Sequence, residues 1–138
     1  MLLKDLQSFK KFAADFAKKL RPNSVVAFNG DLGAGKTEFS RAIIQSLVSK
    51  DQNIPSPTFT IVQTYPGISH FDLYRVKSAA ELEEIGLFDA IGHDIVLIEW
   101  PELALPFLPK DTIFINITAD GTAREITIES LHGHHKQE

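Results

Sequence analysis

The residues best suited to chemistry lie in one glycine-rich segment, residues 30–37, with the sequence GDLGAGKT. The segment satisfies every fixed position of the phosphate-binding P-loop pattern G-x-x-x-x-G-K-[ST]. Its glycines let the backbone form a concave nest whose N–H groups point at phosphate oxygens, and the N-terminal end of a following helix adds positive potential. We therefore predict that a nucleotide is bound by Asp31, Leu32, Gly33, Ala34, Gly35, Lys36, Thr37 and Glu38.

Two side chains of this P-loop have separate tasks. Lys36 is expected to reach the β and γ phosphates, and the Thr37 hydroxyl is expected to ligate the Mg²⁺ that bridges them. The structural alternative is a glycine turn that only begins a helix, but a buried, unpaired lysine would serve no packing purpose there. The chain has no Asn-Lys-x-Asp segment of the kind that reads guanine, so the expected nucleotide is ATP.

A P-loop enzyme also needs a carboxylate at the end of a neighbouring buried strand, where it holds magnesium or the water around it. Glu99 follows the apolar run 95–98, and Asp72 follows a segment with strand character. The alternative for each is a carboxylate that caps a turn or pairs with an arginine such as Arg75. We predict that both carboxylates lie at the nucleotide.

The surrounding elements are arranged to position these residues. The apolar run 25–28 predicts a buried strand that leads into the glycine loop, and apolar spacing over 39–47 predicts the helix after it. An amphipathic helix over 6–20 comes first.

Further along, the pattern predicts a hairpin of strands 58–65 and 68–73, and a short helix with a capping box at Ser78 and a glycine end at Gly86. Residues 112–118 and 124–129 alternate like exposed edge strands.

Length and composition fit one α/β domain. The 138 residues suit a single P-loop NTPase-like domain over 1–130, with a mixed, mostly parallel central sheet flanked by helices, and 131–138 as a flexible tail. The absence of cysteine excludes disulfides, thiolate metal sites and cysteine nucleophiles. The net charge of −4 argues against unaided binding of DNA or RNA. The sequence shows no signal peptide or membrane span, so we expect a cytoplasmic protein.

Four segments together resemble the TsaE family, formerly YjeE, of small bacterial ATPases needed for threonylcarbamoyladenosine in transfer RNA. They are the P-loop, SPTFTIV at 56–62, HFDLYR at 70–75 and LIEWPE at 97–102, in the family's order. The resemblance extends over about residues 1–130.

This resemblance implies an ATPase that works with TsaD and TsaB, which attach the threonylcarbamoyl group to adenosine 37 of transfer RNAs reading A-starting codons. TsaE itself does not perform that transfer, and it meets transfer RNA only through the complex. Residue by residue, the resemblance implies that Lys36 binds phosphate, Thr37 and Glu99 ligate magnesium, and Asp72 assists hydrolysis. Ser56 and Thr58 would form a switch loop beside the γ-phosphate.

The sequence departs from the family in two places. Glu38 stands where many members have threonine or serine, and the segment between Tyr65 and His70 is short.

Two other functions fit the same glycine-rich loop. A small P-loop kinase would share the loop, but it normally needs several lid arginines, and this chain has four arginines in all. A nucleotide-gated scaffold without catalysis would bind ATP and show no hydrolysis stimulated by partners.

Overall fold

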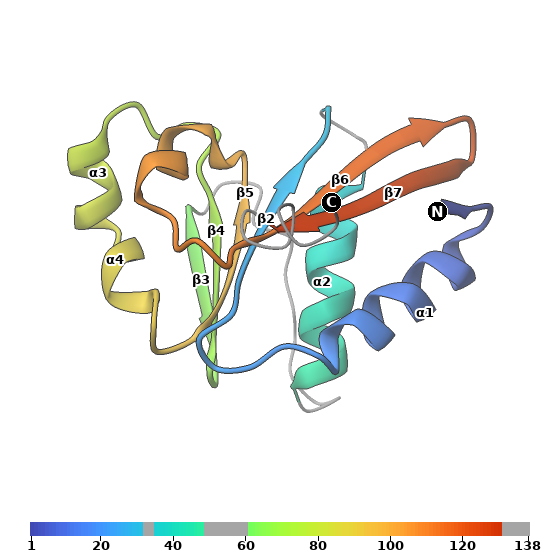
Figure 1. Cartoon of the computed structure of the whole chain (residues 1–138), viewed down its shortest axis with the longest axis horizontal. Coiled ribbons are helices and arrows are strands. Elements are labelled where there is room, and N and C mark those ends of the chain that lie inside the picture. The colour runs from blue at the N-terminus through green and yellow to red at the C-terminus, as the bar shows by residue number, and fades with distance from the viewer. Residues whose placement is uncertain (32–34, 49–60, 131–138) are drawn as a thin grey trace.

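The structure is a computed structural model of the chain, and it describes residues 1–31, 35–48 and 61–130. The described residues form one seven-stranded sheet with helices on both faces (Figure 1). The strands are β1 (Leu2–Leu3), β2 (Val25–Asn29), β3 (Val62–Tyr65), β4 (Ile68–Asp72), β5 (Ile95–Glu99), β6 (Ile113–Asp120) and β7 (Ala123–Ser130). The helices are α1 (Leu6–Ala17), α2 (Lys36–Leu47), α3 (Ala79–Glu84), α4 (Leu87–Ala90) and the 3₁₀ helix η1 (Pro101–Phe107).

The sheet has the strand order β1-β7-β6-β2-β5-β4-β3. Its four inner strands β6, β2, β5 and β4 pair in parallel, whereas the pairs β3–β4, β6–β7 and β1–β7 are antiparallel. The predicted mixed sheet is therefore confirmed, with its parallel part at the centre. Parallel strands bring their carboxyl ends to a common edge, so the residues that follow β2, β4 and β5 meet there.

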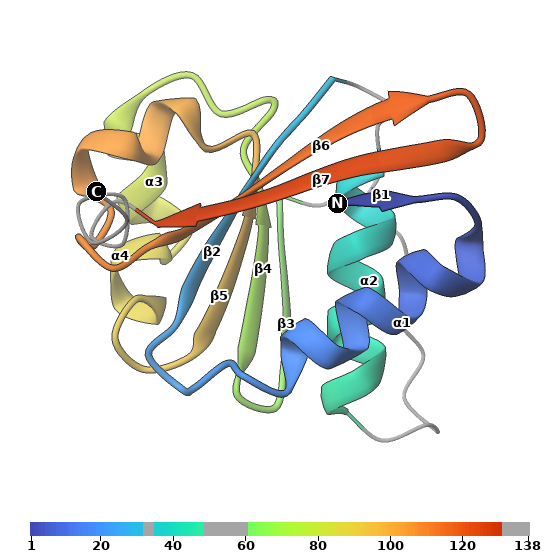
Figure 2. The same ribbon diagram turned by 45° about the vertical axis from the view of Figure 1, so that its right-hand side comes forward.

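Two apolar clusters cover the two faces of the sheet. In one cluster, α1 and α2 pack against Val26 and Phe28 of β2, and in the other, α3, α4 and η1 pack against Val25 (Figure 2). Strand β5 divides in the same way, with Leu97 on the first face and Ile98 on the second. Burial on both faces explains why these strands are continuously apolar in the sequence.

Most of the predicted elements are confirmed, with adjusted bounds. The N-terminal helix ends at Ala17, earlier than predicted, and the first hairpin strand begins at Val62, while residues 58–60 lie outside the described part. Ser78 accepts a hydrogen bond from the Glu81 backbone N–H, and Gly86 has the left-handed conformation expected there, with φ of 83°.

The prediction of two exposed edge strands near the C-terminus is wrong for the first of the two. Strand β6 lies inside the sheet, paired on one side with β2 and on the other with β7. Strand β7 has the short β1 beside it, in which Leu2 and Leu3 pair with Glu125 and Arg124, and its residues 127–129 are exposed, as predicted. A strand of two residues is too short to show a sequence pattern. Alternation of polar and apolar residues indicates which face of a strand is buried, but it does not indicate which strands lie beside it.

Among the residues that the structure describes, no helix combines the length and apolar character needed to cross a membrane.

Candidate active site

A small hollow lies at the edge of the sheet where β4 and β5 end and α2 begins. Its lining combines four of the eight residues predicted to bind the nucleotide with both predicted carboxylates and Trp100: Gly35, Lys36, Thr37, Glu38, Asp72, Glu99 and Trp100. Asp72 and Glu99 are paired in the register of β4 and β5, so the two carboxylates stand next to each other on the sheet. We call this the active-site hollow.

Gly35 sets the entry into α2. It has φ of 114° and ψ of 13°, a left-handed conformation that strains any residue with a Cβ. Gly35 is the N-cap residue of α2 and has no side chain with which to cap the helix. The first backbone N–H groups of an α-helix have no partner within the helix, and a helix start of this kind is suited to an anion.

Lys36 is buried, with 4% of its surface exposed. Its Nζ donates a hydrogen bond to the carbonyl of Gly30 at 2.6 Å and lies 3.2 Å from the ring centroid of Trp100. Burial lowers the pKa of Lys36, and the nearby carboxylates, Glu99 first among them, oppose that shift. An ammonium held in this way is a ready partner for a negatively charged ligand.

Trp100 follows β5 directly and lines the hollow. It is the non-glycine residue with positive φ among those described, at φ of 57° and ψ of 62°. A bulky residue in this region is strained by about 1–3 kcal/mol and persists only where its surroundings hold it. Tyr74 provides part of that hold, with ring centroids 4.8 Å apart. The sequence left the role of Trp100 open, and the structure places it against Lys36.

Glu99 is held from two sides at the end of β5. Thr37 Oγ1 donates to Glu99 Oε1 at 2.7 Å, and His70 Nε2 lies 2.6 Å from Glu99 Oε2, within hydrogen-bond distance. Both His70 and Glu99 are buried, at 1% and 2% exposed. The two bonds fix the carboxylate next to the Thr37 hydroxyl.

Sequence reasoning assigned no role to His70, although a signal was present. In a strand, residues two apart face the same side, so His70 shares a face with Asp72. Because Asp72 was predicted to lie at the nucleotide, a place at the same site could have been predicted for His70 as well.

Asp72 is only half buried at the end of β4. It accepts a hydrogen bond from the Tyr74 backbone N–H at 3.1 Å. Burial raises the pKa of Asp72, the Tyr74 bond works in the opposite direction, and the nearby Glu99 raises it further. This carboxyl group therefore holds a proton more readily than an exposed aspartate.

The chemistry of the donors fits magnesium. Among the residues described, no three histidine or carboxylate side chains gather into a metal site. The Thr37 hydroxyl and the Glu99 carboxylate nevertheless place hard oxygens 2.7 Å apart beside the buried Lys36. Magnesium in nucleotide sites is commonly held by one or two protein groups together with phosphate oxygens and water, so two protein oxygens suffice here.

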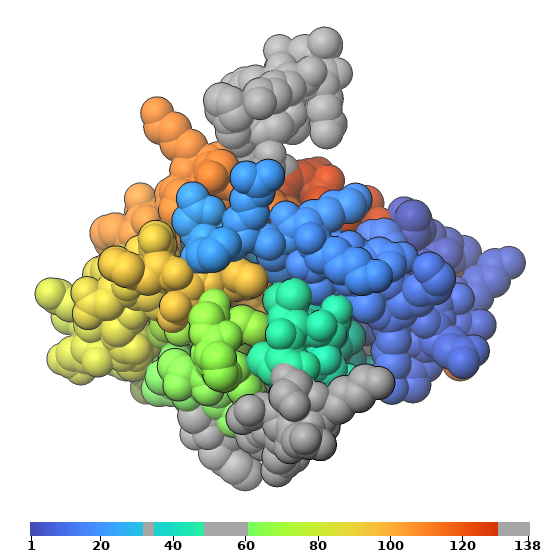
Figure 3. Space-filling model, turned by 90° about the horizontal axis from the view of Figure 1, so that it is seen from below, coloured from blue at the N-terminus to red at the C-terminus, as the bar shows by residue number. Residues whose placement is uncertain are grey.

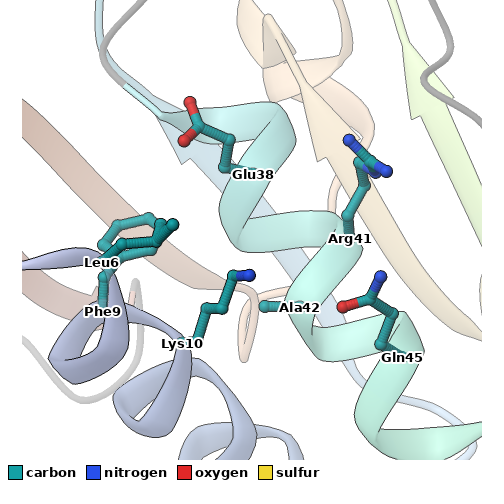
Figure 4. A pocket seen from close by; sticks show the side chains of 7 residues that line it. All are labelled: Leu6, Phe9, Lys10, Glu38, Arg41, Ala42 and Gln45. Atoms are coloured by element: carbon teal, nitrogen blue, oxygen red, sulfur yellow. The ribbon is translucent and has the colours of Figure 1, made fainter.

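The other predicted residues divide into two groups. Asp31 and Glu38 are exposed, and Glu38 also borders a second pocket between α1 and α2, with Leu6, Phe9 and Lys10 (Figure 4). The remaining predictions lie outside the described residues and stay predictions: Leu32, Gly33 and Ala34 of the P-loop, Ser56 and Thr58 of the switch loop, and the tail 131–138.

The fold and this hollow define a mixed α/β protein with a lysine, a hydroxyl and two carboxylates at the carboxyl edge of its parallel strands. The sequence model of "Threonylcarbamoyl adenosine biosynthesis protein TsaE" matches residues 3–126. The chain belongs to the TsaE family.

Individual relatives agree with this assignment. The tRNA threonylcarbamoyladenosine biosynthesis protein TsaE of Rickettsia typhi is 45% identical, with 78% of each chain covered. The protein of the same name from Bacillus subtilis is 35% identical, over 92% of this chain and 80% of its own. The crystal structure of Bacillus subtilis YdiB superposes with a TM-score of 0.76 at 28% identity, covering 99% of this chain and 88% of that one.

Proposed function

We propose that this chain binds and hydrolyses ATP with Mg²⁺ and takes part in the threonylcarbamoyl modification of adenosine 37 in transfer RNA. It would act with TsaD and TsaB and leave the transfer itself to them, and it would work in the cytoplasm. The observation that supports this most is the meeting of Lys36, Thr37 and Glu99 in one hollow beside the start of α2. Family membership supports the pathway.

Lys36 and the start of α2 would bind the phosphates. The Lys36 ammonium would leave the Gly30 carbonyl and the Trp100 ring for β and γ phosphate oxygens, which are stronger partners because they are charged. The first N–H groups of α2 would donate hydrogen bonds to the other phosphate oxygens.

Thr37 and Glu99 would hold magnesium, which neutralises charge on the phosphates when it is bound. Asp72 would orient the attacking water or take up its proton, because it faces the same hollow and retains exposure to solvent. Its raised pKa brings it closer to the range in which a carboxyl exchanges protons near neutral pH.

The test is phosphate release from ATP by the purified chain, alone and with TsaB and TsaD. We expect weak turnover alone and stimulation by the two partners. Lys36→Ala should lose ATP binding, whereas Asp72→Ala should lose turnover and keep binding. The control is Lys110→Ala, which removes an exposed lysine far from the P-loop in sequence.

Each contrary result has its own meaning. ATP binding without partner-stimulated hydrolysis would replace the ATPase with a nucleotide-gated scaffold. A phosphorylated small molecule as product would indicate a kinase. Full multiple-turnover modification by Lys36→Ala in a reconstituted system would overturn the proposal.

A further inference from the structure

Charge is divided unevenly along this chain. Residues 78–108 contain no lysine or arginine and seven acidic residues, namely Glu81, Glu83, Glu84, Asp89, Asp94, Glu99 and Glu102. Residues 4–21 carry the opposite excess, with six basic residues against Asp5 and Asp15. The net charge of −4 is therefore concentrated in one part of the chain.

The fold turns this division into two separate surfaces. Helices α3 and α4 and the 3₁₀ helix η1 lie together on one side of the sheet, and α1 lies on the other (Figures 1 and 3). We call α3, α4 and η1 the acidic lobe. Four of its carboxylates are exposed, on Glu83, Glu84, Asp89 and Glu102.

The acidic lobe also exposes an aromatic pair. Phe88 of α4 and Phe107 of η1 are 38% and 47% exposed, and their rings meet edge to face with centroids 5.4 Å apart. Together with Ala79, Ala80 and Glu83 they line a shallow hollow. Leu105, 43% exposed, lies two residues before Phe107 on η1.

This combination is typical of a protein-binding surface. Exposed aromatic side chains contribute strongly at interface centres, because they bury a large rigid area at a low entropic cost. Glu83 at the hollow and the other exposed carboxylates of the acidic lobe would attract a basic partner and repel phosphate groups. The hollow shares no lining residue with the active-site hollow.

We propose that the acidic lobe docks a segment of a partner protein in which lysine or arginine side chains flank an apolar one. The apolar side chain would enter the hollow between Phe88 and Phe107, and the basic side chains would meet Glu83 and Glu84. This inference rests on the proposed function in one respect, since it takes the partner to be TsaD or TsaB.

The experiment measures binding of a purified TsaB–TsaD mixture to the immobilised chain, at low and at high salt. Phe88→Ser and Phe107→Ser should each weaken binding about 30-fold, the effect of losing an aromatic hot spot. The double variant Glu83→Lys/Glu84→Lys should slow association about tenfold at low salt and less at high salt. Ile128→Ser is the matched control, because Ile128 is a 40% exposed apolar residue on β7.

Folding and nucleotide binding are checked for every variant by circular dichroism melting and by titration with a fluorescent ATP analogue. Unchanged partner binding by both phenylalanine variants would overturn the docking surface and leave the proposed function standing. Failure of the unaltered chain to bind the mixture would instead count against the proposed function and its partners. If the unaltered chain associates with itself and Phe88→Ser does not, the hollow binds a second copy of the chain, and this inference is overturned.

Discussion

The ends of β4 and β5 place two carboxylates next to each other in very different settings. Glu99, at the end of β5, is 2% exposed, and each of its oxygens has a side-chain partner. Asp72, at the end of β4, is half buried and has a backbone N–H as its partner. Strand register alone makes these two residues neighbours, so their difference comes from what surrounds each side chain.

The contrast suggests a division of work. A carboxylate fixed by two hydrogen bonds has little freedom and suits a ligand whose oxygen must stay in one place. A carboxyl that is partly open to water can exchange protons and rearrange during a reaction. Neighbouring carboxylates with different environments are a common way to assign separate roles within one site.

The largest effect is expected from removing the buried partner of Glu99. His70→Leu should destabilise the fold by about 3 kcal/mol, because it leaves a buried carboxyl oxygen of Glu99 without its hydrogen-bond partner. His70→Gln, which keeps an N–H donor, should recover a good part of that loss. Urea unfolding measures both, and His93→Leu at an exposed histidine is the control. Equal stability of the leucine variant and the unaltered chain would show that the pair does not hold Glu99.

The next largest effect concerns turnover. Glu99→Gln keeps the shape of the side chain but loses its charge, so turnover should fall on the order of 10²- to 10³-fold, as for other lost electrostatic contacts at a reacting centre. Phosphate release at saturating ATP measures this. The control is Glu129→Gln, which removes an exposed carboxylate on β7 and should keep a rate near that of the unaltered chain. A Glu99→Gln rate within threefold of the unaltered chain would remove Glu99 from the site.

The smallest effect distinguishes Asp72 by its dependence on pH. Burial raises the pKa of Asp72 above its ordinary 3.8, so the folded chain holds this proton more tightly than the unfolded chain. The resulting stabilisation is fully present below pH 3.8 and is lost as pH rises through the folded pKa. Asp72→Asn cannot ionise, and its stability relative to the unaltered chain should therefore rise between pH 3.5 and pH 7.

Thermal melting at both pH values measures this change. The exposed Asp111→Asn variant controls for the loss of one negative charge. A relative stability of Asp72→Asn that falls with pH would mean that the folded state favours the charged carboxylate.

The sequence predicted the features of this site that depend on local patterns. The strand before the glycine-rich segment and the helix after it are predicted from short runs of residues, and β2 and α2 appear where those runs indicate. Glu99 was located because an apolar run ends at it. Local pattern and final structure agree here because burial of a run on both faces of a sheet leaves a clear signal.

The features that the sequence did not predict depend on pairing between distant segments. His70 meets Glu99 across 29 residues, and only the parallel alignment of β4 and β5 brings them together. The position of β6 inside the sheet likewise depends on its pairing with β2 and β7. The contact between Lys36 and Trp100 requires a left-handed turn at Trp100, which is rare for a bulky residue.

The turn at Trp100 has a further consequence, which is optical. Trp100 is the chain's single tryptophan, so selective excitation of indole reports from one point of the molecule. That point lies 3.2 Å from the Lys36 ammonium, whose charge perturbs the excited ring. Movement of Lys36 from the ring to a phosphate would change the fluorescence emission of Trp100. The chain therefore carries an intrinsic reporter of nucleotide binding, the first step of its proposed cycle.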